Sequence, residues 1–255
     1  MKIKILFIFL ISFFISGCFF NEDERELISL GLSPKGMYLL AQDEISGGAV
    51  DEAIKILNQI QAAYPSSKYA IQSRLDVAYQ LFKRDRYDES IDSINAFLKL
   101  YPDHFSTPYA LFLRGLNAES RSKSILDEFN ITDNAQRDVG SVKEALNYYL
   151  DLIKKYPNNK YSDEAKSKMV SLRNILSRHE LFIAIFYTNN KSHIAAINRC
   201  KTIIEKYPNT PSVPAALHLI ALNYDKINAP KLAEDARRVL KASYPKYIPH
   251  YSLEN

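Results

Sequence analysis

The side chains that could catalyse a reaction or hold a metal are dispersed along this sequence of 255 residues. His179 is followed by Glu180, as in the HExxH zinc motif, but Ile183 stands where that motif requires its second histidine. We interpret His179 and Glu180 as surface residues. The five histidines lack metal-ligand spacing with one another: His104, His179, His193, His218 and His250. With no glycine-rich phosphate loop either, we predict no enzyme activity, no metal site and no cofactor.

An acidic cluster, Asp85, Asp88 and Glu89, could in principle supply a catalytic acid and base. Arg84 and Arg86 are interleaved with it. Alternating charges of this kind are typical of a solvated face on which the side chains form ion pairs. The pattern therefore favours a salt-bridged helix junction over a catalytic pair.

Cys18 has a more specific setting. It follows Gly17 and an apolar run over residues 5–15 that is too short to span a bilayer. Residues 15–18 read Ile-Ser-Gly-Cys and resemble the bacterial lipoprotein signal, in which a peptidase cuts before the cysteine and its thiol takes a diacylglycerol. The alternative is a general secretory signal with an incidental cysteine, but the usual Ala-x-Ala-like site is missing. We expect residues 1–17 to be removed and Cys18 to carry the lipid.

The residue after Cys18 indicates which membrane the lipidated protein is sorted to. A triacylated cysteine holds a protein firmly on a membrane. Bacterial lipoprotein sorting uses aspartate after the cysteine for inner-membrane retention, and Phe19 stands there, so we expect the periplasmic face of the outer membrane. Residues 18–33 read as a charged tether, and Ser33 with Pro34 is a helix start signal.

The composition beyond the signal excludes some functions. Lysine and arginine number 33 against 29 acidic residues, and two lysines leave with the signal. This near-balance gives no nucleic-acid footprint. One thiol besides Cys18 remains, Cys200, so no intrachain disulfide can form there, and its place on an apolar stripe predicts a buried structural residue.

A repeat organises the rest of the chain. Five times a tyrosine precedes a proline, and a small residue stands twelve positions before that proline, with apolar residues between them on one helical face. Because proline disfavours helix in the residue before it, each Tyr-Pro marks a helix end. The tyrosines are Tyr64, Tyr101, Tyr156, Tyr207 and Tyr244, and the small residues are Ala53, Ser90, Ala145, Ala196 and Ala233.

These repeats predict an all-α fold, a superhelical stack of about five tetratricopeptide-like helix-turn-helix units. The prolines are 37, 55, 51 and 37 residues apart, compared with a period of 34 in that repeat, whose opening tryptophan is absent here. We expect a repeat domain over residues 34–245, with N-terminal repeats in 34–102 and C-terminal repeats in 103–245, and a frayed tail over 246–255.

Two features account for the long middle repeats. Residues 121–140 form an insertion, which is either a binding loop or a solvated excursion. Residues 163–187 contain no glycine or proline and predict one long helix. The other helices are expected over residues 34–45, 50–64, 68–84, 87–101, from 107, 141–156, 192–207, 213–227 and 230–244.

Several short segments stand out beside the repeats: Leu113-Arg114-Gly115-Leu116, Arg137-Asp138, Tyr156-Pro157-Asn158, Phe186-Tyr187-Thr188 and Asn198-Arg199. Together with the lipid signal, they resemble the BamD family, lipoproteins of the outer-membrane β-barrel assembly machinery. The resemblance spans nearly the whole mature chain, although Val139-Gly140 replaces the proline that usually follows the family's Arg-Asp.

The resemblance implies a non-enzymatic periplasmic scaffold. It implies that the C-terminal repeats bind the periplasmic domains of BamA, that other Bam lipoproteins join, and that the N-terminal repeats bind unfolded outer-membrane proteins. Arg199 matches the family's basic position and would pair with a carboxylate on BamA; a solvated helix charge is the alternative. Asn198, Arg137 and Asp138 are assigned to the same partner contact.

Tyr38 and Tyr79 are our candidates for the substrate groove, since tyrosines serve well at peptide-binding surfaces, but both could equally be core residues.

Two other functions are considered. One is a periplasmic repeat lipoprotein that coordinates cell-wall synthesis or Tol-Pal function; such a protein normally has an N-terminal coiled coil, and no sustained heptads precede residue 34. The other is a lipid-anchored cell-wall hydrolase, which would need a nucleophile or paired carboxylates that the sequence does not offer.

Overall fold

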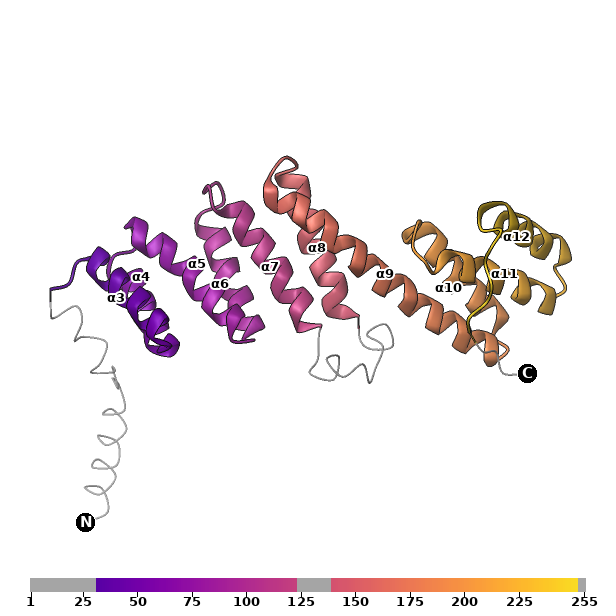
Figure 1. Cartoon of the computed structure of the whole chain (residues 1–255), viewed down its shortest axis with the longest axis horizontal. Helices are drawn as coiled ribbons and strands as arrows, with labels where there is room; N and C mark the ends of the chain where they lie inside the picture. The colour runs from indigo at the N-terminus through magenta and orange to yellow at the C-terminus, as the bar shows by residue number, and fades with distance from the viewer. Residues whose placement is uncertain (1–30, 123–138, 252–255) are drawn as a thin grey trace, which may run out of the picture. The chain divides into compact units, whose positions relative to one another are not determined.

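The computed structural model describes residues 31–122 and 139–251, which contain ten α-helices and no strand. Gly17 and Cys18, the tether up to residue 30, and Arg137 and Asp138 of the insertion lie outside the described residues. The chain divides into two compact units, Met1–Gln80 and Leu81–Asn255. Figure 1 shows the helices in chain order. Within the described residues, the prediction of an all-α chain of five helix pairs is confirmed.

The first unit opens with a helical hairpin. α3 (Pro34–Gly47) packs against α4 (Val50–Ala63), and α5 (Lys68–Lys83) begins in the same unit. The side chain of Ser33 caps α3 by accepting a hydrogen bond from Gly36 N at 3.2 Å, as its sequence signal predicts. Gly48 reverses the chain with φ of +86°, a left-handed conformation that glycine adopts without steric cost.

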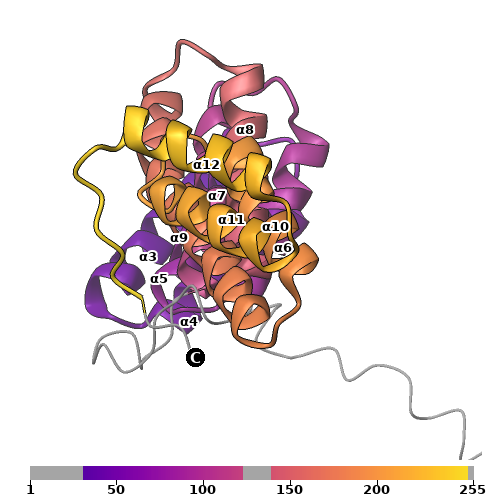
Figure 2. The same cartoon turned by 90° about the vertical axis from the view of Figure 1, so that its right-hand side faces the viewer.

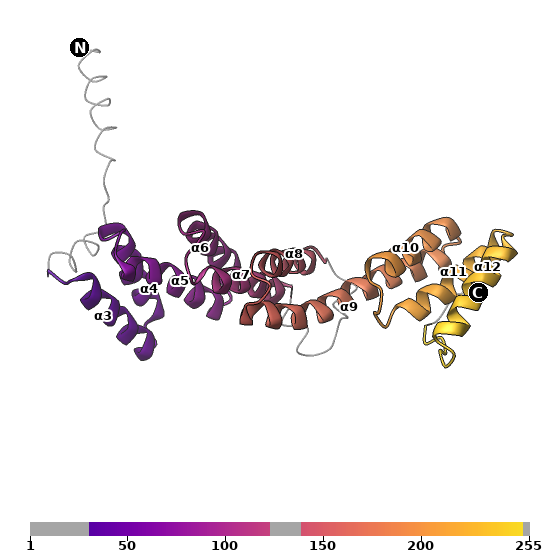
Figure 3. The same ribbon diagram turned by 90° about the horizontal axis from the view of Figure 1, so that it is seen from above.

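In the second unit each helix packs against the next. Figure 3 shows their succession from above. In chain order they are α6 (Tyr87–Leu100), α7 (Thr107–Arg121), α8 (Gly140–Lys155), α9 (Lys160–Asn189), α10 (His193–Lys206), α11 (Val213–Lys226) and α12 (Pro230–Ser243).

The residues that define the repeat occupy equivalent positions in all five helix pairs. The small residue near the start of the second helix of each repeat is fully buried. Each tyrosine of the Tyr-Pro pairs caps its helix: its N–H donates to the carbonyl four residues earlier at 2.8–2.9 Å, while its φ lies between −126° and −136°. The residue before proline has therefore left the helical conformation, and the predicted helix ends are confirmed.

The long helix is confirmed, and α9 serves two cores. Its N-terminal half buries Ala165 and Leu172 in a cluster with α7 and α8, whereas its C-terminal half buries Ala184 in a second cluster with α10 and α11. Ser177, between the two, is hydrogen-bonded to Thr210 at 2.7 Å. One uninterrupted helix thus couples the third repeat to the fourth, which explains much of the added length of the fourth.

The prediction of a frayed tail is wrong for residues 246–251. Tyr251 packs against the second core cluster, and its hydroxyl lies 2.5 Å from Nδ1 of His218. Rings at positions 247 and 251 give the segment apolar surface to bury, and the sequence pattern alone did not indicate a partner for them. Arg237, which interrupts the apolar stripe of the fifth repeat, forms an ion pair with Asp225.

Cys200 is a structural residue, as predicted. Its side chain is fully buried, and burial raises the pKa of the thiol to about 12. In a Cys18→Ser chain, we expect Cys200 to react with Ellman's reagent at least about a hundredfold more slowly than an exposed thiol, because both thiolate and access are lacking. Asn198→Cys, exposed on the same helix, is the matched control. Equal rates for the two thiols in the folded chain would contradict the assignment.

Candidate functional site

Arg199 on α10 is paired with Glu180 on α9. Arg199 Nη1 donates a hydrogen bond to Glu180 Oε2 at 3.1 Å. The Glu180 side chain is 10% exposed and the Arg199 side chain 42% exposed. A buried carboxylate needs a charged or hydrogen-bonding partner, so Arg199 compensates the burial of Glu180 while part of its guanidinium remains at the surface.

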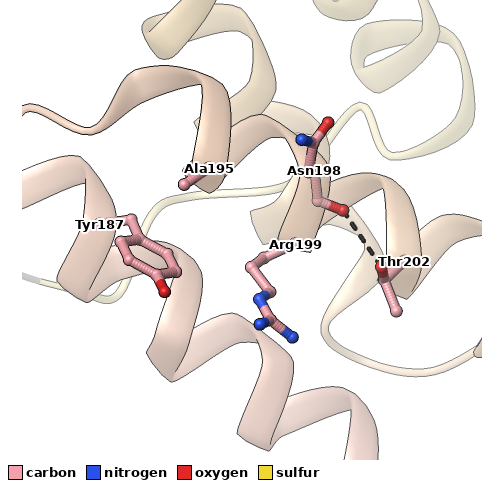
Figure 4. Close-up of a pocket in the computed structure, with 5 residues that line it drawn as sticks. All are labelled: Tyr187, Ala195, Asn198, Arg199 and Thr202. Atoms are coloured by element: carbon pink, nitrogen blue, oxygen red, sulfur yellow. Dashed lines mark hydrogen bonds between the residues drawn. The ribbon is translucent and has the colours of Figure 1, made fainter.

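The surface part of Arg199 lines a depression of about 260 Å³. Figure 4 shows that Tyr187 reaches it from the C-terminal end of α9, whereas the other lining residues stand on α10. Thr202 Oγ1 donates a hydrogen bond to the backbone carbonyl of Asn198 at 3.1 Å. The lining residues are Tyr187, Ala195, Asn198, Arg199 and Thr202.

Exposed apolar side chains adjoin these residues in the sequence. Phe186, beside Tyr187, is 62% exposed, and Ile194, beside Ala195, is also more than half exposed. The rings of Phe186 and Tyr187 meet edge to face with centroids 5.7 Å apart. Aromatic residues and arginine are enriched at protein interfaces, so a depression with these groups suits contact with a protein partner.

The structure changes how Arg199 must be interpreted. Arg199 is neither a freely solvated charge nor an unpaired cation, because it already forms an ion pair with Glu180. A guanidinium has five N–H donors, however, so a second carboxylate can share it. The interpretation of Glu180 as a surface residue is wrong, because it is buried. Nothing in the sequence signalled the pair, since its members stand on different helices.

The acidic cluster at the start of α6 forms ion pairs, as predicted. Arg86 holds Glu89 at 2.5 Å, and Asp88 pairs with Arg121. Among the described residues, no group of three His, Cys, Asp or Glu side chains could hold a metal ion.

In the first unit, Tyr38 belongs to a polar cluster that sequence reasoning missed. Its hydroxyl donates to Asp76 Oδ2 at 2.7 Å, and Gln42 Nε2 reaches the same oxygen at 3.3 Å. Gln72 Nε2 donates to the other carboxylate oxygen at 2.8 Å. Burial, followed by the neighbouring carboxylate, raises the pKa of Tyr38. Tyr38 is thus half-buried and anchored between α3 and α5.

Tyr79, the second groove candidate, lies on α5 and is 40% exposed, so it is not a core residue. Its proposed contact with an unfolded protein segment stays a prediction.

In the parts of the chain that are described, no helix is both long and apolar enough to cross a membrane.

The fold and the depression define a class: a helical-repeat protein whose exposed groups suit binding to another protein. The model of one family, YfiO, described as an outer membrane lipoprotein, matches residues 32–240. This chain belongs to the YfiO family of outer membrane lipoproteins.

Curated relatives agree with this assignment. The chain is 35% identical over 226 residues to the outer membrane protein assembly factor BamD of Neisseria gonorrhoeae, covering 89% of this chain and 85% of that protein. It is 30% identical over 209 residues to BamD of Vibrio cholerae, covering 82% and 86%. The resemblance to the BamD family is therefore confirmed.

Proposed function

We propose that this chain is a lipid-anchored scaffold on the periplasmic face of the outer membrane, where it takes part in the assembly of outer-membrane β-barrel proteins. Membership of the YfiO family and the names of the relatives support this role. The Ile-Ser-Gly-Cys segment supports cleavage after Gly17 and lipidation of Cys18. The lipid would hold the repeats beside the membrane in which the assembled barrels are inserted.

The proposed partners are the periplasmic domains of BamA, the other Bam lipoproteins and unfolded outer-membrane proteins. BamA is assigned to the Arg199 depression, with Asn198 in the same contact and Arg137 and Asp138 as further candidates. Unfolded segments are assigned to the N-terminal repeats, with Tyr38 and Tyr79 as candidate contacts.

One observation carries the BamA assignment: Arg199 is held in place by Glu180 and still exposes part of its guanidinium beside exposed aromatic surface. A cation fixed by an intramolecular partner loses less conformational entropy on binding than a free side chain. A carboxylate on the partner would accept hydrogen bonds from the N–H groups of Arg199 that Glu180 leaves free.

The test uses variants that separate charge from stability. In Glu180→Gln the arginine keeps its cation, whereas in Glu180→Gln/Arg199→Gln both charges are replaced by amides of similar shape. Tagged, lipidated chains are purified from detergent-solubilised membranes, and the co-purifying proteins are identified by mass spectrometry. We expect BamA with wild type and with Glu180→Gln, and at least about tenfold less with the double variant, a loss typical of removing one charged contact.

Equal melting temperatures for the two variants are the control for folding. BamA captured equally by both would contradict the role of Arg199. Cell-wall or Tol-Pal proteins in place of BamA, with wild type itself, would contradict the assembly function and favour an adaptor for those systems.

A further inference from the structure

The segment after α12 does not leave the molecule. Figure 1 shows it running back beside α11, and Figure 2 shows the same segment from the C-terminal end of the second unit. Residues 245–251 contain no helix after the turn that follows Tyr244. A non-helical stretch of this length stays in place only if its side chains find partners.

Two tyrosines of this segment contact one histidine of α11. The hydroxyl of Tyr251 lies 2.5 Å from Nδ1 of His218, and the two rings are 6.0 Å apart. The ring of Tyr247 lies 6.3 Å from the same imidazole. Tyr251 also packs against the core cluster that contains Cys200, and burial raises the pKa of its hydroxyl.

The remaining side chains of the segment point away from the protein. Ile248 is 67% exposed, and Pro249 and His250 are also exposed. Tyr247 and Tyr251 therefore act as anchors, with an exposed span between them. The segment is attached by packing of its tyrosine rings, which includes packing of Tyr251 on the apolar core cluster, and by the hydrogen bond between Tyr251 and His218.

This is how a helical-repeat surface holds an extended peptide that comes from another molecule: a few anchor side chains enter pockets while the intervening residues stay in solvent. We propose that the face of α11 around His218 is a binding site for an extended segment carrying two tyrosines four residues apart. The chain's own residues 245–251 are its resident occupant. We call this face the tail-docking site.

The resident tail is exchangeable because it is tethered at one end and is held there by side-chain contacts. A short tether gives an effective concentration in the millimolar range, so a free peptide of the same sequence competes poorly while the tail is seated. Replacing the two anchor tyrosines weakens the binding of the tail, so the tail competes less with a free peptide. The site must then accept the same tyrosines from a separate molecule. This inference does not depend on the BamA contact, which lies on α9 and α10.

The experiment measures binding of a fluorescent peptide with the sequence of residues 243–255 to the full chain by fluorescence anisotropy. The released variant is Tyr247→Ala/Tyr251→Ala. We expect it to bind the peptide with one-to-one stoichiometry and at least about tenfold more tightly than wild type, the ratio that corresponds to about 1.4 kcal/mol. Ile248→Ala is the matched control in the same segment and should behave as wild type does.

Two further arms test the chemistry of the site. Adding His218→Ala to the released variant should weaken binding about tenfold, and so should a peptide with both tyrosines replaced by alanine. Absence of peptide binding by a released variant that keeps its helical circular dichroism would overturn the proposal, as would equal binding by wild type.

A readout on the wild-type chain covers the case in which the released variant does not fold. Trypsin cuts after Lys246, which stands at the start of the docked segment, and mass spectrometry follows release of residues 247–255. A tail peptide that carries Lys246→Gln, so that trypsin does not cut it and release the same fragment, is added at several millimolar, comparable with the effective concentration of the tethered tail. It should speed this cleavage several-fold if it displaces the tail. A rate unaffected by the peptide would show that the tail does not exchange, and the proposal would fail.

Discussion

Gly115→Ala is expected to lower the melting temperature by about 10 °C. A Cβ at this position of α7 would lie 2.3 Å from Cε1 and 2.6 Å from Cδ1 of Tyr149. The tyrosine ring is fully buried and cannot move aside, and its hydroxyl donates to Glu119 Oε2 at 2.8 Å. Overpacking of this kind costs about 3 kcal/mol, and each kcal/mol shifts the melting temperature by about 2–4 °C in a chain of this size.

The rescue variant identifies the cause. Gly115→Ala/Tyr149→Leu removes the ring that the new methyl group meets, so we expect it to be more stable than Gly115→Ala/Tyr149→Phe, which keeps the ring. Gly47→Ala is the matched control, because no atom lies within 4 Å of its added Cβ. Circular dichroism melts provide the measurement. A Gly115→Ala chain as stable as wild type would show that α7 and α8 can separate without cost.

Arg199→Glu has the second large expected effect, a loss of about 2–3 kcal/mol of stability. Glu180 is almost fully buried, and the substitution removes its cation and sets a second carboxylate beside it. An uncompensated buried charge and a like-charge contact both destabilise the folded state. The change should appear in urea denaturation as a lower midpoint for the second unit.

Glu180→Gln/Arg199→Gln should recover most of that loss, because it leaves no buried charge unpaired and both amides can hydrogen-bond. If Arg199→Glu were as stable as wild type, the pair would not compensate Glu180. This is why partner binding is better tested with the amide variants: loss of BamA with Arg199→Glu alone would not distinguish a lost contact from a loosened α9–α10 junction.

The sequence by itself determined the repeat. Each Tyr-Pro pair ends a helix because proline restricts the residue before it, and each small residue is buried because it shares a face with the apolar positions that follow it. These effects act within one helix, so residue type and spacing were sufficient. The same holds for the Ser33 cap, the long α9 and the ion pair of Arg86 with Glu89 at the start of α6.

The tertiary structure decided everything that joins separate helices. Arg199 meets Glu180 across 19 residues, Tyr251 meets His218 across 33, and Tyr38 meets Asp76 across 38. Each contact depends on how two elements are rotated and offset against each other, and packing of many side chains sets that geometry. The spacing of residues within one helix does not predict this geometry. The sequence left Arg199 as either a partner contact or a solvated helix charge, and only the packed α9 and α10 show that a buried carboxylate holds it.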